Sequence, residues 1–276
     1  MNWTTQIEVW AAAAVALAVV QAVAYLIGRR IGRYNVVDVA WGPGFVAVAA
    51  VAAIVGDGSV SRRIVVLILT AIWGLRLSLH IGRRTAGHGE DPRYTDLLDR
   101  HGHSAAVVIT RVFVLQGVLQ WIVSMPIQIS AVTGPIRGLG WVPAVAGVLL
   151  WGTGLFFEAV GDRQLALFKA DPANRGRIMD RGLWAWTRHP NYFGDFCVWW
   201  GIWLIAAAVW PGVLTVFGPM VMSYLLIRGS GARLLENFMG DRPGYREYQQ
   251  RTAYFIPRPP RAPSGRARSS SGGDVQ

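Results

Sequence analysis

Residues 9–27 read VWAAAAVALAVVQAVAYLI, and this stretch decides the fold class. It contains no charged residue, and Gln21 is its one strongly polar side chain. About 20 mostly apolar residues are enough for an α-helix to cross the hydrocarbon core of a bilayer. Further apolar stretches follow along the chain, so we predict an all-α, polytopic membrane protein with seven transmembrane helices. The predicted spans are Val9–Ile27, Val36–Val55, Ile64–His80, Val107–Ile129, Val142–Val160, Tyr192–Trp210 and Val213–Ile227.

The composition of the whole chain agrees with insertion into a membrane. Of its 276 residues, 53% are hydrophobic and 16% are charged, whereas an ordinary soluble domain carries about 25% charged residues. The single cysteine, Cys197, excludes an intramolecular disulfide scaffold and a cysteine-rich zinc site. We therefore expect no metal centre.

The basic residues predict the orientation and the partners. The net charge is +11, which in a soluble protein would suggest nucleic acid. Here the basic residues cluster in loops between apolar stretches, so we expect anionic lipid headgroups and a phosphorylated ligand, and no nucleic acid or obligate protein partner. The segments after the first, third, fifth and seventh predicted spans hold 22 of the 27 Lys and Arg residues. Because cytoplasmic loops are enriched in such residues, we predict an external N-terminus and a cytoplasmic C-terminus. The opposite loops hold Arg62, Arg63 and Arg137.

We expect a single domain over residues 1–257. Its first four predicted spans form a substrate half, and the last three, together with residues 228–257, form a cofactor half. Residues 258–276 are rich in proline, serine, glycine and arginine, and we predict that they form a disordered basic tail.

Ionisable side chains in or beside the predicted spans are candidates for function, because such groups are costly at membrane depth. Asp38 lies just inside the second span. Burial favours the protonated form of a carboxyl, so Asp38 is predicted to donate a hydrogen bond to a substrate carbonyl. The alternative is an ion pair with Arg33 or Arg76. His80 follows Arg76 by one helical turn and shares its face.

Two further polar segments follow predicted spans. The loop at residues 87–94 is either a solvated loop or a cap over a lipid-facing cavity, to which Tyr94 contributes. Glu158, Asp162 and Lys169 line one stripe at the end of the fifth span. They form either a solvated stripe or a ligand cradle, in which carboxylates bind ribose or amide groups and the cation meets a phosphate.

The stretch Arg188-His-Pro-Asn-Tyr-Phe-Gly-Asp195 begins the sixth predicted span. Proline is typical of the first helical position, and the N–H groups of the first turn suit a phosphate. Asn191 and Asp195 are four residues apart, so their amide and carboxylate can bind a heterocycle or a sugar from one helix face. Arginines are concentrated before this point, at Arg175, Arg177, Arg181 and Arg188.

Together these segments resemble the steroid 5-alpha-reductase C-terminal family, specifically its uncharacterised bacterial branch. The resemblance implies a membrane reductase that binds NADPH in a cytoplasm-facing cavity of a bacterial cell membrane. Hydride would pass to the β-carbon of an α,β-unsaturated carbonyl while an acid polarises the carbonyl oxygen, and the substrate would be a lipophilic steroid, sterol, isoprenoid or fatty acyl compound. A Rossmann site is excluded, since no Gly-x-Gly-x-x-Gly motif follows a predicted strand. The matching segments are residues 38–42, 89–94, 158–169, 188–195 and 236–257.

The resemblance also implies roles for individual residues. Asp38 corresponds to a glutamate that contacts the substrate carbonyl and His80 to a tyrosine, and with Tyr94 they form the expected catalytic group. Asn191 and Asp195 correspond to residues that hold the cofactor. The other expected cofactor-binding residues are Glu158, Asp162, Lys169, Arg177, Arg188, Tyr192, Arg228, Glu236 and Tyr248.

Two other functions remain open. Membrane methyltransferases of the isoprenylcysteine or phospholipid type, which use S-adenosylmethionine, also carry an Arg-His-Pro-x-Tyr turn and a late glutamate. They typically double that glutamate, whereas Asn237 follows Glu236 here. A non-enzymatic membrane protein, such as a transporter, is the third reading. Transporters often show repeated halves and broken helices at the midplane, whereas this chain shows no repeat and has its polar groups near the predicted cytoplasmic ends.

Overall fold

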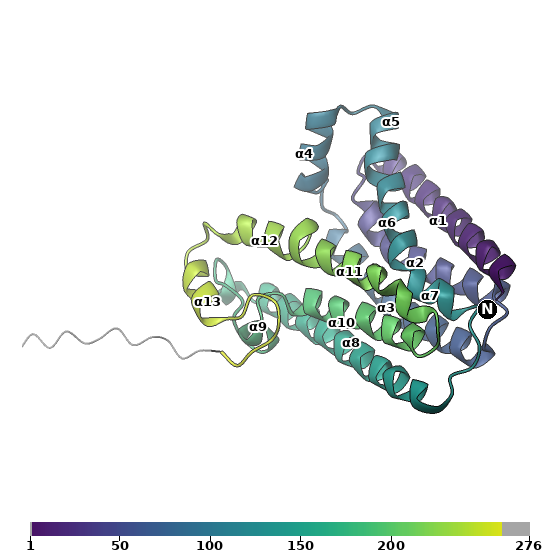
Figure 1. The fold of residues 1–276 in the computed structure, drawn as a ribbon. Helices are drawn as coiled ribbons and strands as arrows, with labels where there is room; N and C mark the ends of the chain where they lie inside the picture. The colour runs from purple at the N-terminus through teal and green to yellow at the C-terminus, as the bar shows by residue number, and fades with distance from the viewer. Residues whose placement is uncertain (1, 261–276) are drawn as a thin grey trace, which may run out of the picture. The chain divides into compact units, whose positions relative to one another are not determined.

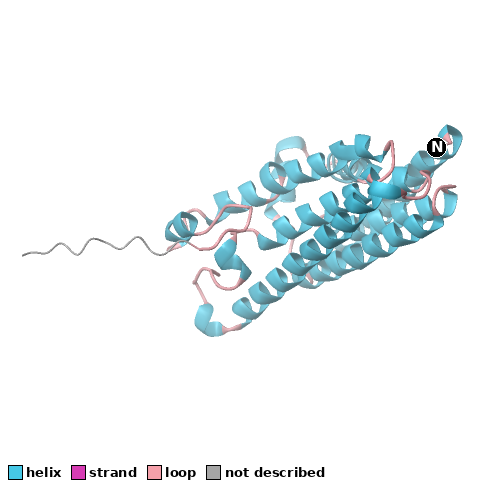
Figure 2. Ribbon diagram, turned by 60° about the horizontal axis from the view of Figure 1, so that its bottom comes forward, coloured by secondary structure: helices cyan, strands magenta, loops and turns pink. Residues whose placement is uncertain are grey.

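The computed structural model describes residues 2–260, which form helices joined by loops, and no strand occurs among them (Figure 2). The predicted all-α class is therefore confirmed. The long helices are α1 (Trp3–Ile31), α2 (Val36–Val55), α3 (Val60–Thr85), α8 (Trp141–Ala170) and α10 (Pro190–Ala207) (Figure 1). The shorter helices are α4 (Pro92–His101), α5 (Ala105–Val108), α6 (Leu115–Val123), α7 (Met125–Ser130), α9 (Leu183–Trp186), α11 (Phe217–Tyr224), α12 (Ala232–Met239) and α13 (Tyr245–Arg251). Two π-helical segments, Ile109–Val114 and Leu225–Gly229, continue into or from these helices.

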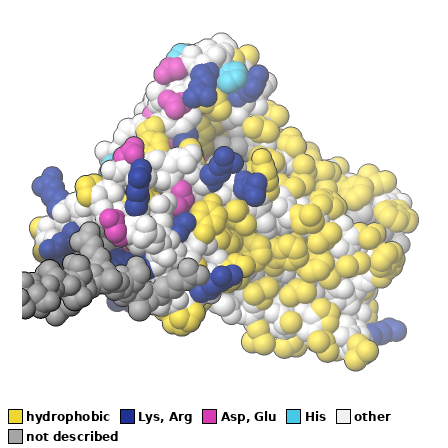
Figure 3. Space-filling model, turned by 60° about the vertical axis from the view of Figure 1, so that its left-hand side comes forward, with side chains coloured by type: hydrophobic (Ala, Val, Ile, Leu, Met, Phe, Trp, Pro, Cys, Tyr) yellow, Lys and Arg dark blue, Asp and Glu magenta, His cyan; other side chains and the backbone are white. Residues whose placement is uncertain are grey.

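Six helical stretches within the described chain are long and apolar enough to cross a membrane. They match six of the seven predicted spans, and hydrophobic side chains form a wide area on the molecular surface, as lipid-facing helices require (Figure 3). The chain is thus an integral membrane protein by length and composition. The six stretches are Trp3–Ile31, Val36–Val55, Val60–Thr85, Ala105–Val123, Gly138–Ala170 and Gly212–Met239.

The remaining predicted span, Tyr192–Trp210, corresponds to α10. This element is helical over 18 residues, but it is not among the six apolar stretches. Its first two turns contain Asn191 and Asp195, and these polar residues lower its hydropathy. The predicted helix is present, while the predicted count of seven spans goes beyond what length and composition support.

The chain divides into two compact units. Of the described residues, the first unit comprises those up to Leu155 together with Asp195–Leu225, and the second comprises Phe156–Gly194 together with residues 226–260. This division differs from the predicted substrate and cofactor halves, because most of α10 and all of α11 belong to the first unit. Gly147 and Gly201 show why: a Cβ added to either would lie 2.6 Å from the other's carbonyl oxygen, so α8 and α10 pack closely there.

The core of the first unit is built on α1, α2 and α3. Helices α2 and α3 come together at Gly42 and Gly74, where a Cβ on Gly42 would lie 2.0 Å from the Gly74 carbonyl oxygen. Beside this contact, the ring of Phe45 lies 5.7 Å from that of Trp73 and 4.3 Å from that of Trp199. Aromatic rings at such separations add favourable packing energy to their burial, so these rings join α2, α3 and α10.

Two arginines on the side predicted to be external have structural roles. Arg62 donates to the Ser130 carbonyl at 3.2 Å and to Thr133, and Arg63 donates to the Ala53 carbonyl at 2.7 Å. These acceptors lie at the ends of α7 and α2, where helix carbonyls lack partners in their own helix. The two charges are thus used to cap helices.

In the second unit, a C-terminal extended segment pairs with the turn that precedes α10. The Arg188 N–H donates to the Ala253 carbonyl at 2.9 Å, and the Arg258 N–H donates to the Trp186 carbonyl at 3.0 Å. Residues 228–257, which were assigned to the predicted cofactor half, therefore contain α12, α13 and most of this segment. Arg258, the first residue of the predicted tail, is held by the pairing, and residues 261–276 of that tail lie outside the described residues.

Candidate functional site

A polar cluster in the first unit contains two of the three predicted catalytic residues. Asp38 lies in the first turn of α2, and Arg93 and Tyr94 lie in the first turn of α4. The Arg93 guanidinium is 2.7 Å from one oxygen of the Asp38 carboxylate, and the Tyr94 hydroxyl donates to the other at 2.6 Å. The predicted alternative for Asp38, an ion pair, is present, but its partner is neither Arg33 nor Arg76.

The Tyr94 hydroxyl also accepts a hydrogen bond from Gln116 Nε2 at 3.0 Å. Burial and the neighbouring Asp38 raise the pKa of Tyr94 well above its ordinary value. The phenol therefore keeps its proton at neutral pH, while both oxygens of Asp38 act as acceptors. The group placed to donate a proton in this cluster is Tyr94.

Arg93 fixes the geometry of Asp38. It also pairs with Asp91 at 2.9 Å, and Asp91 caps the N-terminus of α4 by accepting from the Arg93 backbone N–H. Burial alone would lower the pKa of Arg93, but the hydrogen bond to Asp91 and the charge of Asp38 raise it above its ordinary value. Arg93 is thus a permanent cation that holds two carboxylates at the start of α4.

The loop before α4 is exposed over residues 86–89 and is held to the start of α2 by hydrogen bonds. Glu90 accepts hydrogen bonds from the backbone N–H groups of Tyr34 and Asn35, the latter at 2.9 Å, and Asn35 Nδ2 donates to the Gly89 carbonyl. A carboxylate is favourable beside the positive N-terminal end of a helix, which here is the start of α2. The loop is therefore ordered against the start of α2, while its role as a cap over a lipid-facing cavity stays a prediction.

A chain of uncharged polar groups continues from Tyr94 into the apolar bundle. Gln116 accepts from the Trp41 indole N–H, Gln120 Nε2 donates to the Trp41 carbonyl at 2.9 Å, and Gln21 Nε2 donates to Gln120 at 2.7 Å. Sequence reasoning missed Gln116 and Gln120 because it considered only ionisable residues in the spans. The sequence alone could have pointed to both glutamines, because an amide side chain inside an apolar stretch needs a hydrogen-bond partner.

The second unit contains another cluster, built around Glu236 of α12. One oxygen of its carboxylate accepts from Arg188 Nε at 2.8 Å and from the Tyr245 hydroxyl at 2.7 Å, and lies 3.0 Å from His189 Nε2. The other oxygen accepts from Gln249 at 2.6 Å. Arg188 and Glu236 were predicted to bind cofactor, but sequence reasoning did not include His189, Tyr245 or Gln249.

Arg188 is held by several protein groups. Its Nη1 donates to the carbonyls of Gln249 and Thr252 at 3.0 Å each, and its guanidinium lies 5.3 Å from the centre of the Tyr254 ring. With Glu236 on Nε, these contacts show that Arg188 fixes the turn before α10. It is a positioning residue in this structure.

His189 is buried within the same cluster, with 1% of its surface exposed. Burial lowers the pKa of His189 below its ordinary value, although the hydrogen bond with Glu236 opposes this shift. The neutral ring therefore carries its proton on Nε2, facing the carboxylate. Its Nδ1 is left as an acceptor without a hydrogen-bond partner among the described residues.

The other predicted site residues differ in their exposure to solvent. Glu158 and Asp162 of α8 are buried, which excludes a fully solvated stripe, while Lys169, Arg177 and Arg228 are exposed. Asn191, Tyr192 and Asp195 are half-buried along the first turns of α10, and His80 is half-buried in α3.

Two of the tyrosines in the predicted cofactor set have defined partners. Tyr192 stacks on His189 with a centroid separation of 5.7 Å. The Tyr248 hydroxyl donates to the Trp184 carbonyl at 2.6 Å, so it holds α13 against α9. No group of three His, Cys, Asp or Glu residues suited to a metal ion occurs within residues 2–260.

The helices and the two buried polar clusters define an α-helical integral membrane protein with ionisable groups held in fixed geometry. The chain belongs to the family described as "protein of unknown function (DUF1295)", whose model matches residues 24–252. No curated protein and no solved structure matches the chain.

Proposed function

We propose that the protein is a membrane-embedded, NADPH-dependent reductase of a carbon–carbon double bond conjugated to a carbonyl in a lipophilic substrate. The observation that carries the proposal is the hydrogen-bonded group of Tyr94, Asp38 and Arg93. It presents a buried, protonated phenol in an apolar bundle. The resemblance of residues 38–42, 89–94 and 188–195 to the steroid 5-alpha-reductase C-terminal family supports the same chemistry.

Reduction of an enone requires a hydride at the β-carbon and an acid at the carbonyl oxygen. The nicotinamide supplies the hydride when NADPH is bound. Without substrate, the Tyr94 hydroxyl donates to Asp38, which Arg93 holds in place. When the substrate binds, Tyr94 would turn this proton from Asp38 to the carbonyl oxygen, donating first a hydrogen bond and then the proton. The role first predicted for Asp38 passes to Tyr94 in this scheme.

The predicted cofactor-binding residues fit a dinucleotide by their chemistry. Exposed arginines at Arg175, Arg177 and Arg181 precede α10, where first-turn N–H groups and cationic side chains suit phosphates. The buried carboxylates of Glu158 and Asp162 suit ribose hydroxyls. Asn191 and Asp195 lie one turn apart on α10, as the resemblance requires.

The proposal includes the membrane topology. We take α10 as a seventh span, with an external N-terminus and a cytoplasmic C-terminus in a bacterial cell membrane. The excess of basic residues on the predicted cytoplasmic side supports it. The ordered roles of Arg62 and Arg63 explain why two arginines lie on the other side.

A second candidate is a methyltransferase that uses S-adenosylmethionine. The contact of Glu236 with both Arg188 and His189 favours it, because that superfamily combines an Arg-His-Pro-x-Tyr turn with a late glutamate. The single glutamate and the Asn191–Asp195 pair favour the reductase.

Calorimetric titration of the purified full chain in lipid nanodiscs separates the two candidates. We expect NADPH to bind, and Asn191→Ala to weaken that binding at least tenfold, about 1.4 kcal/mol. Asn237→Ala removes an exposed amide outside the motif and serves as the matched control, with unchanged affinity. Binding of S-adenosylmethionine without any dinucleotide binding would establish the methyltransferase and reject the reductase.

A further inference from the structure

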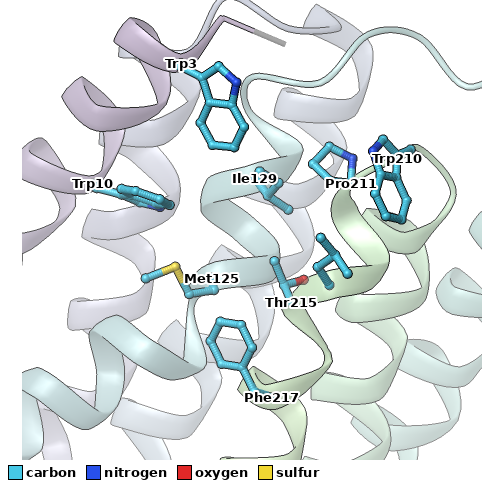
Figure 4. Close-up of a pocket in the computed structure, with 9 residues that line it drawn as sticks. Trp3, Trp10, Met125, Ile129, Trp210, Pro211, Thr215 and Phe217 are labelled. Atoms are coloured by element: carbon cyan, nitrogen blue, oxygen red, sulfur yellow. The ribbon is translucent and has the colours of Figure 1, made fainter.

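The first unit contains a cavity of about 490 Å³ between the start of α1, α7 and the segment that leads into α11 (Figure 4). Ligand pockets typically have volumes of roughly 300–1,000 Å³, so the cavity is large enough for part of a small molecule. In Figure 4, Trp3 and Trp10 of α1 lie on one side, with Met125 beside Trp10 and Phe217 below, and Trp210 lies on the other side.

The side chains that line the cavity favour a hydrocarbon ligand. Eight of the nine lining residues are apolar or aromatic. The ninth, Thr215, uses its hydroxyl to donate to the Gly212 carbonyl at 2.7 Å, so that hydroxyl is turned to its own backbone. A cavity with such walls gains free energy when apolar groups replace water.

The cavity lies at the opposite end of the first unit from Asp38, Arg93 and Tyr94. Helix α1 has 29 residues, and at about 1.5 Å per residue Trp3 is roughly 40 Å from Ile31. The chain enters α2 at Val36, after a short turn that follows Ile31, so Asp38 lies near that far end. Since the hydrocarbon core of a bilayer is about 30 Å thick, the two ends of α1 face opposite leaflets.

The side chains at the opening match a membrane interface. Trp3 is 64% exposed and Trp210 is 72% exposed, and tryptophan is enriched where lipid tails meet the headgroups. Leu214 and Phe217 of the lining are also exposed, on a stretch that is apolar enough to span a membrane. The cavity therefore opens toward lipid.

We propose that this cavity is a binding site for a hydrocarbon chain of a membrane lipid, separate from the polar cluster at the other end of α1. The occupant is a lipid because the opening lies at interface depth, the walls are apolar, and the exposed indoles of Trp3 and Trp210 suit the boundary between lipid tails and headgroups. The proposal is independent of the reductase assignment, since it uses none of the residues placed in that reaction.

The test uses the full chain in nanodiscs that contain a phospholipid with a photoactivatable group at the end of one acyl chain. After illumination, labelled peptides are mapped by mass spectrometry over a series of probe fractions. We expect labelling of residues 3–10, 125–129 and 210–217 to saturate at low probe fraction. Labelling at Val15 and Val19, which are exposed on α1 outside the cavity, should rise in proportion to the probe.

Leu214→Trp and Leu149→Trp form a matched pair, because both leucines are exposed and only Leu214 lines the cavity. The larger ring at residue 214 should reduce the saturable labelling at least tenfold, while Leu149→Trp leaves it unchanged. Labelling of the cavity segments in simple proportion to the probe would overturn the proposal. It would also fail if mass photometry showed a dimer that Leu214→Trp dissociates, with no saturable labelling, since a second copy would then fill the cavity.

Discussion

The carboxylates of Asp38 and Glu236 illustrate two ways in which this protein holds a partly buried charge. Glu236 receives donors from Arg188, Tyr245 and Gln249 as well as His189, so its capacity to accept is used within the protein. Asp38 has two donors, and one of them, Tyr94, carries a titratable proton. The first arrangement fixes a turn, and the second can take part in proton transfer.

Replacement of Tyr94 by phenylalanine tests the proton donor. It removes the hydroxyl while keeping the buried ring, so we expect turnover of a lipophilic enone to fall by about 100-fold or more. NADPH affinity should stay within twofold, because no proposed cofactor contact is changed. The measurement is NADPH oxidation by the purified protein across a panel of enones, with calorimetry for the affinity.

Tyr224→Phe is the control, since this tyrosine is 63% exposed and lies outside both clusters. It should leave both quantities unchanged. Equal losses of turnover and of NADPH affinity in Tyr94→Phe would show that Tyr94 acts on the fold rather than on the substrate. Unchanged turnover would remove Tyr94 from the reaction.

Among the elements, the pair α2 and α3 depends most directly on small residues. The Cβ of an alanine at residue 42 would lie 2.0 Å from the Gly74 carbonyl and 2.3 Å from Ser78 Oγ. Ser78 also donates to the Val39 carbonyl at 2.8 Å, so the helices are held together at this point. A backbone carbonyl has little freedom to move, and the helices would have to separate.

We therefore expect Gly42→Ala to reduce the free energy of unfolding by at least about 2 kcal/mol, as overpacking of a close contact does. Gly152→Ala is the matched control, because a Cβ there meets nothing within 4 Å, and alanine favours a helix over glycine by about 1 kcal/mol. Thermal and denaturant unfolding in detergent measure both variants. Equal stability of the two would show that α2 and α3 do not pack at Gly42.

On the scale of the whole molecule, the topology decides where each cluster meets water. The side of the membrane on which a residue lies can be measured with single cysteines at Gly134, Gly89 and Glu247 in a Cys197→Ser background. These positions are suitable because a Cβ at either glycine meets nothing within 4 Å and Glu247 is exposed. In sealed right-side-out membranes, an impermeant maleimide should label Gly134→Cys directly. It should label Gly89→Cys and Glu247→Cys after permeabilisation alone.

The labelling of Glu247→Cys also tests whether α10 crosses the membrane. If α10 crosses the membrane, there are seven spans and α13 lies in the cytoplasm. If it does not, the helix that follows it ends on the external side, and Glu247→Cys reacts in sealed membranes. That result would contradict the seven-span topology while leaving the six apolar spans intact.

Much of the site could be recognised from the sequence, but its pairings could not. Asp38 and Tyr94 were both candidates, whereas Arg93 lay in the matching segment 89–94 but was given no role, and the partners expected for Asp38 were Arg33 and Arg76. Arg33 instead donates to the carbonyls of Thr85 and His88 at 2.7 and 2.6 Å. Arg93 and Tyr94 follow Asp38 by 55 and 56 residues in the sequence and contact it in the fold. No local periodicity of the sequence predicts a contact over that separation.

The sequence by itself determined that the chain is helical and where its apolar spans lie, because insertion of a helix into lipid depends on transfer free energies summed over neighbouring residues. The tertiary structure alone decided which buried polar groups satisfy one another. A carboxylate or amide in an apolar bundle must find a donor, and several residues along the chain qualify. Packing of α4 beside α2, and of the C-terminal segment beside the turn before α10, selected Arg93 for Asp38 and Arg188 for Glu236.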